Sequence, residues 1–458
     1  MFSIRIILFS IFSLLAFGCA VGPKYVRPTT QIPAAYKETG NWKIAHPQDG
    51  ILRGEWWKIF NDPRLDELEA QVNISNQNIA QAAAQYQEAR AALQADRAGF
   101  FPTLSATGSY TRSHGVSGTV SENLLSGDVS WELDLWGKIR RTVEAGRAAA
   151  QASAADLENI RLSAQAQLAQ DYFQLCSLDA QKKLLDDTVV IYQKFFDLTK
   201  NQYASGVAAQ SAVIQAKTQL EATQAQAIDI GVQRSQLEHA IAVALGKPAS
   251  DFSIAPLTLP TTVPFIPAGL PSEILERRPD IAAAERTVAA ANAQIGVAES
   301  AYFPTLTLGA SGSYGSSNLA NLFSSPNPLW SLGPILAGTI FDAGLRQAQT
   351  AEARATYEAD VAFYRQTVLT AFQQVEDNLA ALRILEQEEK VQDQTVKDAQ
   401  KAVELETNQY KAGTASVLEV IITQAAALTD EKAAVIILGE RMNACVLLIQ
   451  YLGGGWKA

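Results

Sequence analysis

The sequence predicts an α+β protein, mainly α, built from a tandem duplication. Each half is expected to hold a helix, two short strands and two very long helices that form a coiled-coil hairpin. Three observations lead to this fold class: Ala and Gln are abundant, motifs recur about half a chain apart, and no Pro interrupts residues 138–203. A continuous helix over that stretch would be about 100 Å long at 1.5 Å per residue, which exceeds the diameter of a compact domain.

The composition excludes several classes of function. The 458 residues carry 37 Lys and Arg against 47 Asp and Glu, and a net charge of −10 argues against a nucleic-acid partner. Three Cys and three His are too few for a disulfide scaffold or a zinc cluster. No catalytic triad or phosphate-binding loop stands out, and His239 in a predicted helix is interpreted as a surface or packing residue. We therefore expect no enzyme, no metal and no cofactor.

The N-terminus has the features of an export signal. Arg5 precedes a short apolar run that ends in small residues, and residues 1–18 are interpreted as a signal peptide. The run Leu15–Cys19 resembles a bacterial lipobox, which implies that Cys19 becomes the lipidated first residue of the mature chain. Ala20 directly after the Cys implies sorting to the outer membrane. Residues 19–63 then form a lipidated N-terminal segment.

Two halves share one plan. Phe100–Leu104 recurs as Tyr302–Leu306, and Asn201–Gly206 recurs as Asn408–Gly413, at offsets close to 205 residues. One structural unit duplicated in tandem explains such matches better than chance. The predicted boundaries are a first repeat at 64–246, a Pro- and Thr-rich linker at 247–271, and a second repeat at 272–458.

Each half contains strands with two unlike faces. Residues 103–111 alternate strictly between Ser or Thr and apolar or Gly residues, and residues 305–314 do much the same. In the strand up to Leu135, the polar face is expected to carry Asp128, Glu132 and Asp134. A fourth strand is predicted at about 332–341, less clearly, because it contains Pro334. By alternation alone, half-buried strands of a soluble core would be the favoured interpretation of all four.

The long helices favour another interpretation. Apolar positions from Leu178 to Tyr203 and from Val417 to Leu452 step by three and four, which is typical of a coiled-coil seam. Gly206 and Gly413 then lie at the tips of helical hairpins. A lipidated, exported chain with such strands suggests a sheet in lipid, where an unpaired strand edge is unfavourable by several kcal/mol per group. Four strands cannot close a barrel, so several copies must share one around a wet lumen.

Several distinctive motifs occur along the chain: Cys19–Pro28, Trp56-Trp57 with Phe60–Leu65, the two Phe-Pro-Thr-Leu segments, Trp131–Gly137, Arg277–Asp280 and Phe341–Gly344. These motifs resemble the TolC-like outer-membrane efflux channel family, in its lipoprotein branch. The resemblance implies a homotrimer with a 12-strand transmembrane barrel and a 12-helix periplasmic barrel. It also implies docking to a periplasmic adaptor and an inner-membrane pump, so that the chain would be a passive exit duct for drugs or other small molecules.

The resemblance also implies site residues. The hairpin tips would contact the adaptor, and Glu419 falls where family channels carry an acidic aperture residue; a solvated helix face is an equal alternative. Ile422 and Ala415 stand where other members have charges, so a charge-based gate is not expected. The tip positions are Ser205, Gly206, Val207, Ala412, Gly413 and Thr414.

Two other functions stay open at this point. The same pore could serve type I protein secretion, in which an ABC exporter supplies a protein cargo. In a different class, the chain could be a structural coiled-coil lipoprotein of the envelope, with soluble strands and no conductance.

Overall fold

The computed structural model confirms a mainly helical α+β chain. It describes residues 20–30, 54–116, 118–264, 266, 277–324 and 329–454, so the predicted signal peptide, Cys19 and much of the linker lie outside the described residues. The helices are η1 (Trp56–Phe60), α2 (Pro63–Ser75), α3 (Gln77–Ala98), α4 (Lys138–Ala204), α5 (Gln210–Ala244), η2 (Ala249–Asp251), α7 (Pro279–Ser300), η3 (Leu319–Asn321), α8 (Leu345–Lys411) and α9 (Val417–Tyr451). The strands are β1 (Thr103–Gly115), β2 (Gly118–Leu133), β3 (Thr305–Ser316) and β4 (Leu329–Ala337).

The chain forms two compact units. One consists of residues 1–30, 84–155 and 281–367, and the other of residues 31–83, 156–280 and 368–458. Each unit therefore takes segments from both predicted repeats. The predicted repeats at 64–246 and 272–458 describe a duplication of the sequence, and their boundaries stay a prediction.

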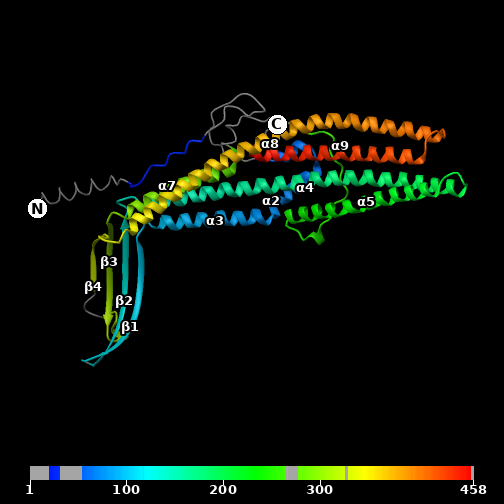
Figure 1. Ribbon diagram of the computed structural model, residues 1–458. Helices are drawn as coiled ribbons and strands as arrows, with labels where there is room; N and C mark the ends of the chain where they lie inside the picture. The colour runs from blue at the N-terminus through cyan, green and yellow to red at the C-terminus, as the bar shows by residue number, and fades with distance from the viewer. Residues whose placement is uncertain are drawn as a thin grey trace. The chain divides into compact units, whose positions relative to one another are not determined.

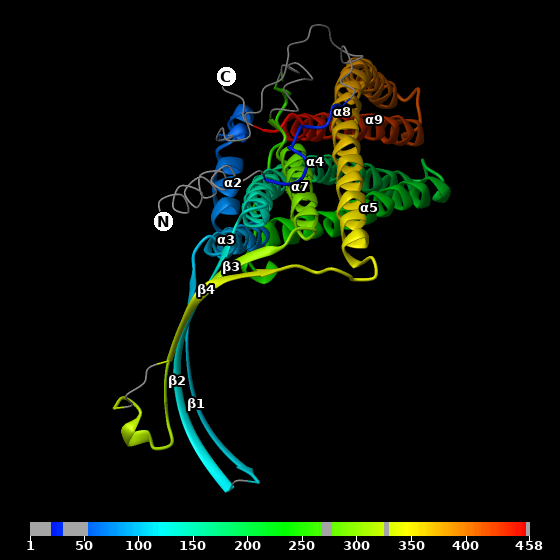
Figure 2. The same ribbon diagram turned by 90° about the vertical axis from the view of Figure 1, so that its left-hand side faces the viewer.

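The first unit contains one antiparallel sheet in the order β1-β2-β3-β4 (Figures 1 and 2). Its register aligns residues of like polarity across the strands. Leu104 pairs with Val129, Val129 with Ala310, and Ala310 with Leu332. The next row joins Ser105, Asp128, Ser311 and Ser331 in the same way. Because side chains alternate between faces, this register gives the sheet one apolar and one polar face, as the alternation predicted.

The strands differ from the prediction in length and limits. They are not short, since β1 has 13 residues and β2 has 16. The fourth strand was predicted at about 332–341 and instead spans Leu329–Ala337. Pro334 lies within it, opposite Leu308 of β3. The missing N–H of Pro334 is tolerated because β4 is an edge strand whose other side has no partner in the described chain.

The second unit contains two helical hairpins, formed by the C-terminal parts of α4 and α8 with α5 and α9 (Figure 1). The corresponding helices match in length: α4 and α8 have 67 residues each, and α5 and α9 have 35 each. Their buried side chains interlock near the tips, which confirms the predicted seam. One cluster there consists of Tyr192, Ala216, Leu220, Val417 and Ile421.

α9 is the one described helix that is long and apolar enough to cross a membrane. Its apolar side chains nevertheless have partners within the unit. Val417 and Ile421 pack with residues of α4 and α5, and Leu428 packs with Leu185 and Ala227. We therefore interpret α9 as a core helix of the hairpin bundle.

The single helix predicted before the first strand pair is wrong, because two helices, α2 and α3, occupy this position. The break falls at Asn76, whose backbone is extended (φ −66°, ψ 123°). Its side-chain Oδ1 accepts hydrogen bonds from the N–H groups of Asn78 and Ile79, and its Nδ2 donates to the Ala244 carbonyl. Asn76 thus caps the start of α3, a role that Asn commonly has at helix N-termini.

Candidate functional site

The polar face of the sheet carries only acidic charges. Asp128 and Glu132, both predicted there, lie on this face together with Glu122, which pairs with Thr111 of β1. Among the strand residues that the structure describes, no Lys or Arg shares the face. Glu122 was not among the predicted residues, although it lies ten residues before Glu132 and therefore has the same place in the alternation. Around these acids the face consists mainly of Ser, Thr and Gly.

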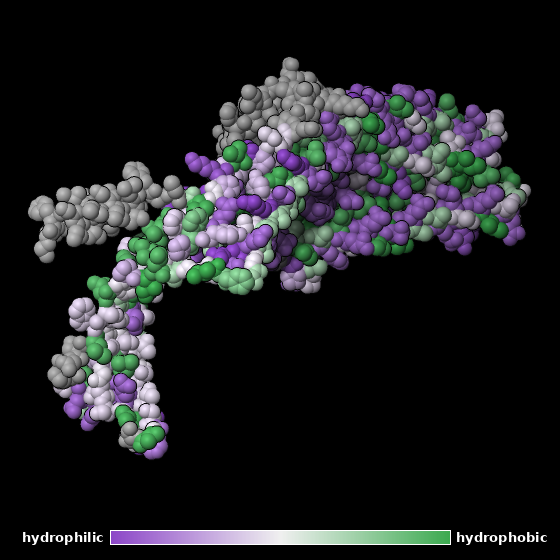
Figure 3. Space-filling view, turned by 60° about the vertical axis from the view of Figure 1, so that its left-hand side comes forward, coloured by the Kyte–Doolittle hydropathy of each residue, from purple (hydrophilic) through white to green (hydrophobic). Residues whose placement is uncertain are grey.

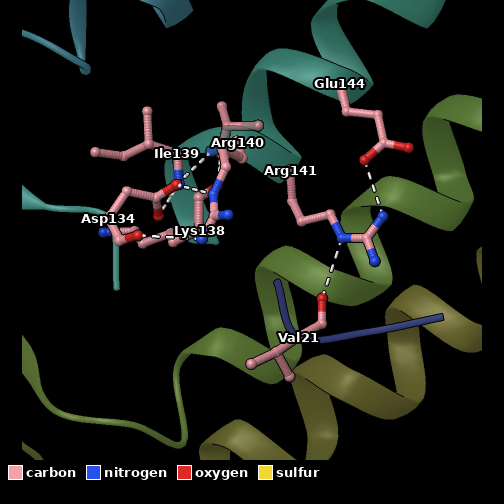
Figure 4. Close-up of polar contacts among 8 residues, drawn as sticks. Val21, Asp134, Lys138, Ile139, Arg140, Arg141 and Glu144 are labelled. Atoms are coloured by element: carbon pink, nitrogen blue, oxygen red, sulfur yellow. Dashed lines mark hydrogen bonds and ion pairs between the residues drawn. The ribbon is translucent and has the colours of Figure 1, made fainter. Parts of the chain in front are cut away.

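Asp134 does not lie in the strand, contrary to the predicted alternation up to Leu135. β2 ends at Leu133, and the Asp134 carboxylate accepts hydrogen bonds from the N–H groups of Ile139 and Arg140 at 3.0 Å each (Figure 4). Arg140 Nε also donates to it at 2.9 Å. A carboxylate at a helix N-terminus is stabilised by the free N–H groups of the first turn. Asp134 therefore fixes the start of α4.

The second half repeats this junction. Asp342 accepts hydrogen bonds from the N–H groups of Gly344 and Arg346 and forms an ion pair with the Arg346 guanidinium. The hydrogen bond from Arg346 lowers the pKa of the Asp342 carboxyl below its ordinary value. The 67-residue helices α4 and α8 thus each begin next to an Asp that pairs with an Arg of the first turn.

The apolar face of the sheet is exposed and ends in aromatic side chains. Leu104 and Leu332 are 76% and 75% exposed. Trp131 Nε1 donates to the Phe100 carbonyl at 3.0 Å, and Trp136 stacks on Phe303 with ring centroids 4.7 Å apart. Residues of intermediate and apolar hydropathy dominate the strands in Figure 3, whereas hydrophilic residues are frequent over the helical hairpins. Exposed apolar strands with an aromatic girdle are typical of a surface that faces lipid.

Residues 20–30, here called the strap, lie against the helices of the first unit. Val21 N–H donates to the Trp136 carbonyl at 2.9 Å, and Arg141 donates to the carbonyls of Val21 and Gly22 at 3.1 and 3.0 Å (Figure 4). A Cβ on Gly22 would lie only 2.5 Å from the Gly296 Cα, so the strap approaches α7 more closely than any side chain would allow. Cys19, the predicted lipid anchor, directly precedes this docked segment.

The strap is also fixed further along. Asn292 Nδ2 donates to the Pro23 carbonyl at 3.1 Å, and the Tyr25 hydroxyl donates to the Glu285 carboxylate. Arg27 Nε donates to the Tyr364 hydroxyl at 3.3 Å. These contacts come from α7 and α8, so the strap holds both helices from one side.

The predicted tips are tight turns between the long helices. Gly206 and Gly413 have φ values of +74° and +77°, a conformation that L side chains rarely adopt. Val207 N–H donates to the Gln202 carbonyl, and Thr414 N–H to the Gln409 carbonyl, each closing the end of a helix. A Cβ on either glycine would meet no atom within 4 Å. Both tips are therefore open to a partner.

Glu419 lies in the first turn of α9. Its Oε2 accepts a hydrogen bond from Ser416 N–H at 2.6 Å, and Ser416 Oγ accepts one from Glu419 N–H at 3.3 Å, which forms a capping box. These bonds hold the pKa of the Glu419 carboxyl below its ordinary value. Ile422, three residues on, is 59% exposed. The aperture role of Glu419 stays a prediction, and the structure gives it a capping role.

The remaining reactive groups lie apart from these surfaces. Cys176 and Cys445 are buried free thiols, as predicted, and burial raises the pKa of Cys445 to about 12. His239 is exposed on α5. Within the described part of the chain, no three His, Cys, Asp or Glu side chains gather in a way that could hold a metal.

Comparisons with known proteins agree with this architecture. The model of the outer membrane efflux protein family matches residues 69–247 and 270–454. The toluene efflux pump outer membrane protein TtgC of Pseudomonas putida is 31% identical, over 96% of this chain and 93% of its own. SilC of Salmonella typhimurium, described as a probable outer membrane lipoprotein, is 27% identical over the whole of both chains. The solved structure of the outer-membrane channel OprN superposes with a TM-score of 0.85, at 28% identity, over 96% of this chain and all of its own.

Proposed function

Because the chain belongs to the family of outer membrane efflux proteins, we propose that three copies form the exit duct of a tripartite pump in the outer membrane. The observation that carries this proposal is the four-stranded sheet, which has a lipid-compatible face, an acidic polar face and two unpaired edges. Three such sheets supply twelve strands, which is enough to close a barrel around an aqueous lumen. The cargo would be small molecules, in keeping with a relative named for toluene efflux.

The sheet edges support oligomerisation. β1 and β4 each pair on one side only in the described chain, and β1 is exposed along its whole length. An open edge within the hydrocarbon leaves backbone N–H and C=O groups without partners, at several kcal/mol for each group. Pairing β1 of one copy with β4 of the next satisfies these groups at every junction.

The helices also carry unpartnered apolar side chains. Ile384, Val391 and Leu405 of α8 are 52%, 68% and 51% exposed and recur at multiples of seven residues. On α5, Ile228 and Val232 are 77% and 58% exposed. Side chains at such spacing bury well against a neighbouring helix, so we expect these stripes to lie between copies.

The test of this function is conductance. The purified trimer, added to a planar lipid bilayer, should open discrete single channels without any ATP or proton gradient, because the duct is passive. A structural coiled-coil lipoprotein would give no current. A trimeric preparation that stays silent at every voltage would therefore overturn the proposal.

We expect the lumen acids to make the channel prefer cations. Asp128→Asn removes three negative charges from the proposed barrel and should shift the reversal potential in a KCl gradient toward zero, by several millivolts at low ionic strength, where screening is weak. The matched control is Asp251→Asn, in η2 and remote in sequence from every strand. An unchanged reversal potential for Asp128→Asn would place this carboxylate outside the conducting path.

The lipid anchor should be separable from assembly. Cys19→Ala is expected to abolish acylation and leave trimers at about the wild-type level, because barrel closure and seam packing do not involve the acyl chains. One acyl chain alone binds a membrane only marginally, whereas a closed barrel does not need it. Metabolic labelling with palmitate and native electrophoresis measure the two effects. Monomers alone in the variant would contradict this expectation.

We propose that the tips bind a periplasmic adaptor. Gly413→Arg places a long cation in an open turn and should reduce drug resistance about tenfold or more at unchanged outer-membrane abundance, since a left-handed Arg is strained by only about 1–2 kcal/mol. Gly413→Asn is the control, because Asn tolerates the same backbone conformation. Normal resistance with Gly413→Arg would count against docking at this tip.

A further inference from the structure

The connection between β3 and β4 ends in an exposed apolar surface for which the duct itself gives no role. Leu319 and Phe323 are 69% and 73% exposed, and we call this pair, carried by residues 318–324, the apolar loop. Figure 2 shows the short helix η3 lying beside the far end of the sheet. Large apolar side chains in water are unfavourable by roughly 25 cal/mol for each Å² of apolar surface, so the pair requires a partner.

We propose that the apolar loop inserts into the outer leaflet of the membrane as an interfacial anchor, an inference that rests on the proposed barrel. The first argument is its side of the sheet. Tyr314 pairs with Leu125 and belongs to the apolar face, and the rings of Tyr314 and Phe323 lie 6.0 Å apart. The loop therefore continues the lipid-facing surface rather than the lumen.

The second argument is depth. From Thr305, next to the aromatic girdle, to Tyr314 the strand rises by about 30 Å along its own axis, or roughly 23 Å along the membrane normal at a tilt near 40°. The apolar band of outer-membrane barrels is about 25 Å tall. Tyr314, and with it Phe323, therefore reaches the outer boundary of the hydrocarbon.

The third argument is polarity. No Asp, Glu, Lys or Arg occurs from Thr305 to Phe341. Part of the loop backbone is also hydrogen-bonded internally: Asn318 Oδ1 accepts from Ala320 N–H at 3.1 Å, and Leu322 N–H and Ser324 N–H donate to the carbonyls of Leu319 and Asn321. A turn without charges and with several of its amide groups already bonded can enter the interfacial region at a reduced desolvation penalty.

The hairpin of β1 and β2 provides a matched control. Gly108 pairs with the same Leu125 as Tyr314, and the hairpin continues beyond this row to Gly115, about 18 Å further along the membrane normal. Val116 at its turn is fully exposed and apolar, while nearby strand positions hold Arg112 and Glu122. Val116 should thus lie in water, although it is as apolar as the loop residues.

The test uses site-directed fluorescence in the full trimer. Phe323→Cys, Leu319→Cys and Val116→Cys are each made in a Cys19→Ala background and labelled with a small polarity-sensitive fluorophore. The other two thiols, Cys176 and Cys445, are buried. The trimers are reconstituted in phosphatidylethanolamine–phosphatidylglycerol vesicles that contain a lipid with a nitroxide near the headgroup. We expect the nitroxide to quench about half of the emission at positions 319 and 323, as for interfacial side chains, and aqueous iodide to quench only position 116.

Three outcomes would overturn the inference. Iodide quenching at 323 equal to that at 116 would place the loop in water. Quenching by neither agent would indicate that a neighbouring copy covers it, and iodide access only from the pore would indicate a plug. Conductance of the same labelled trimers is measured in parallel. Normal channels with a water-exposed loop would refute the anchor alone, whereas absent channels would refute the duct.

Discussion

Val129→Arg should remove most trimers from the outer membrane. Val129 lies in the apolar row Leu104, Val129, Ala310 and Leu332, and its partner Ala310 is halfway between Thr305 and Tyr314. An Arg at the bilayer midplane of a barrel is unfavourable by about 2–4 kcal/mol, and the barrel contains the change three times. A total penalty on the order of 6–12 kcal/mol is comparable to the whole stability of a folded domain, which is about 5–15 kcal/mol.

The control is the adjacent residue. Ser130 pairs with Thr103 and Gly309 on the polar face, so Ser130→Arg should leave trimer yield within about twofold of wild type, since its charge enters water. Heat-modifiable trimers in outer-membrane fractions are quantified for both variants. Equal loss in both would show that the strand tolerates no Arg at all, and equal retention would show that the apolar face does not meet lipid.

The alternation that separates Val129 from Ser130 is also the reason why the sheet could be predicted. Because successive side chains of a strand point to opposite faces, the sequence alone shows which residues share a face. The strands then need only pair in a register that places apolar residues beside apolar ones and polar residues beside polar ones. The seam of α9 was predictable for the same reason, because Val417, Ile421 and Leu428 recur at helical spacing. Where residues recur with the period of their own helix or strand, the face on which they lie could be predicted without knowing any contact between elements.

The features that were predicted wrongly or missed depend on contacts with other elements of the chain. Asn76 breaks a helical pattern through contacts with Ala244, a residue far along the chain. Asp134 continues the strand alternation by one step but is captured by α4, whose first-turn N–H groups compete for the carboxylate. The strap shows neither helical nor strand periodicity. Its position depends on the close approach of Gly22 to Gly296 of α7, and no spacing within the sequence indicates that contact.

The second large effect is expected from a substitution that releases the strap, residues 20–30. Arg141→Ala should release residues 20–30 from α4 and α7, because the 7%-exposed guanidinium is the donor to both the Val21 and Gly22 carbonyls. A carbonyl left without a partner is unfavourable by about 1–3 kcal/mol when it is fully buried. Val21 and Gly22 are only partly buried, so we expect a loss toward the lower end of about 2–6 kcal/mol for the two carbonyls together. The exposed Lys24 should then become a tryptic site, and cleavage would separate the residues before Tyr25, which include the proposed lipid anchor Cys19, from the rest of the chain.

The control variant Glu144→Ala removes the ion pair between Glu144 and Arg141 but leaves the hydrogen bonds from Arg141 to the Val21 and Gly22 carbonyls in place. Glu144 is 45% exposed and binds Arg141 from the solvent side at 2.8 Å, and such pairs contribute about 0–1 kcal/mol. This variant should keep Lys24 protected, since Arg141 retains both carbonyls. Protection of Lys24 in Arg141→Ala would mean that the other contacts of the strap, among them those with Trp136, Asn292 and Glu285, suffice to hold it. Rapid cleavage in both variants would mean that the Glu144 carboxylate orients the guanidinium. In the expected case, one buried cation between α4 and α7 holds the segment that directly follows the proposed lipid anchor.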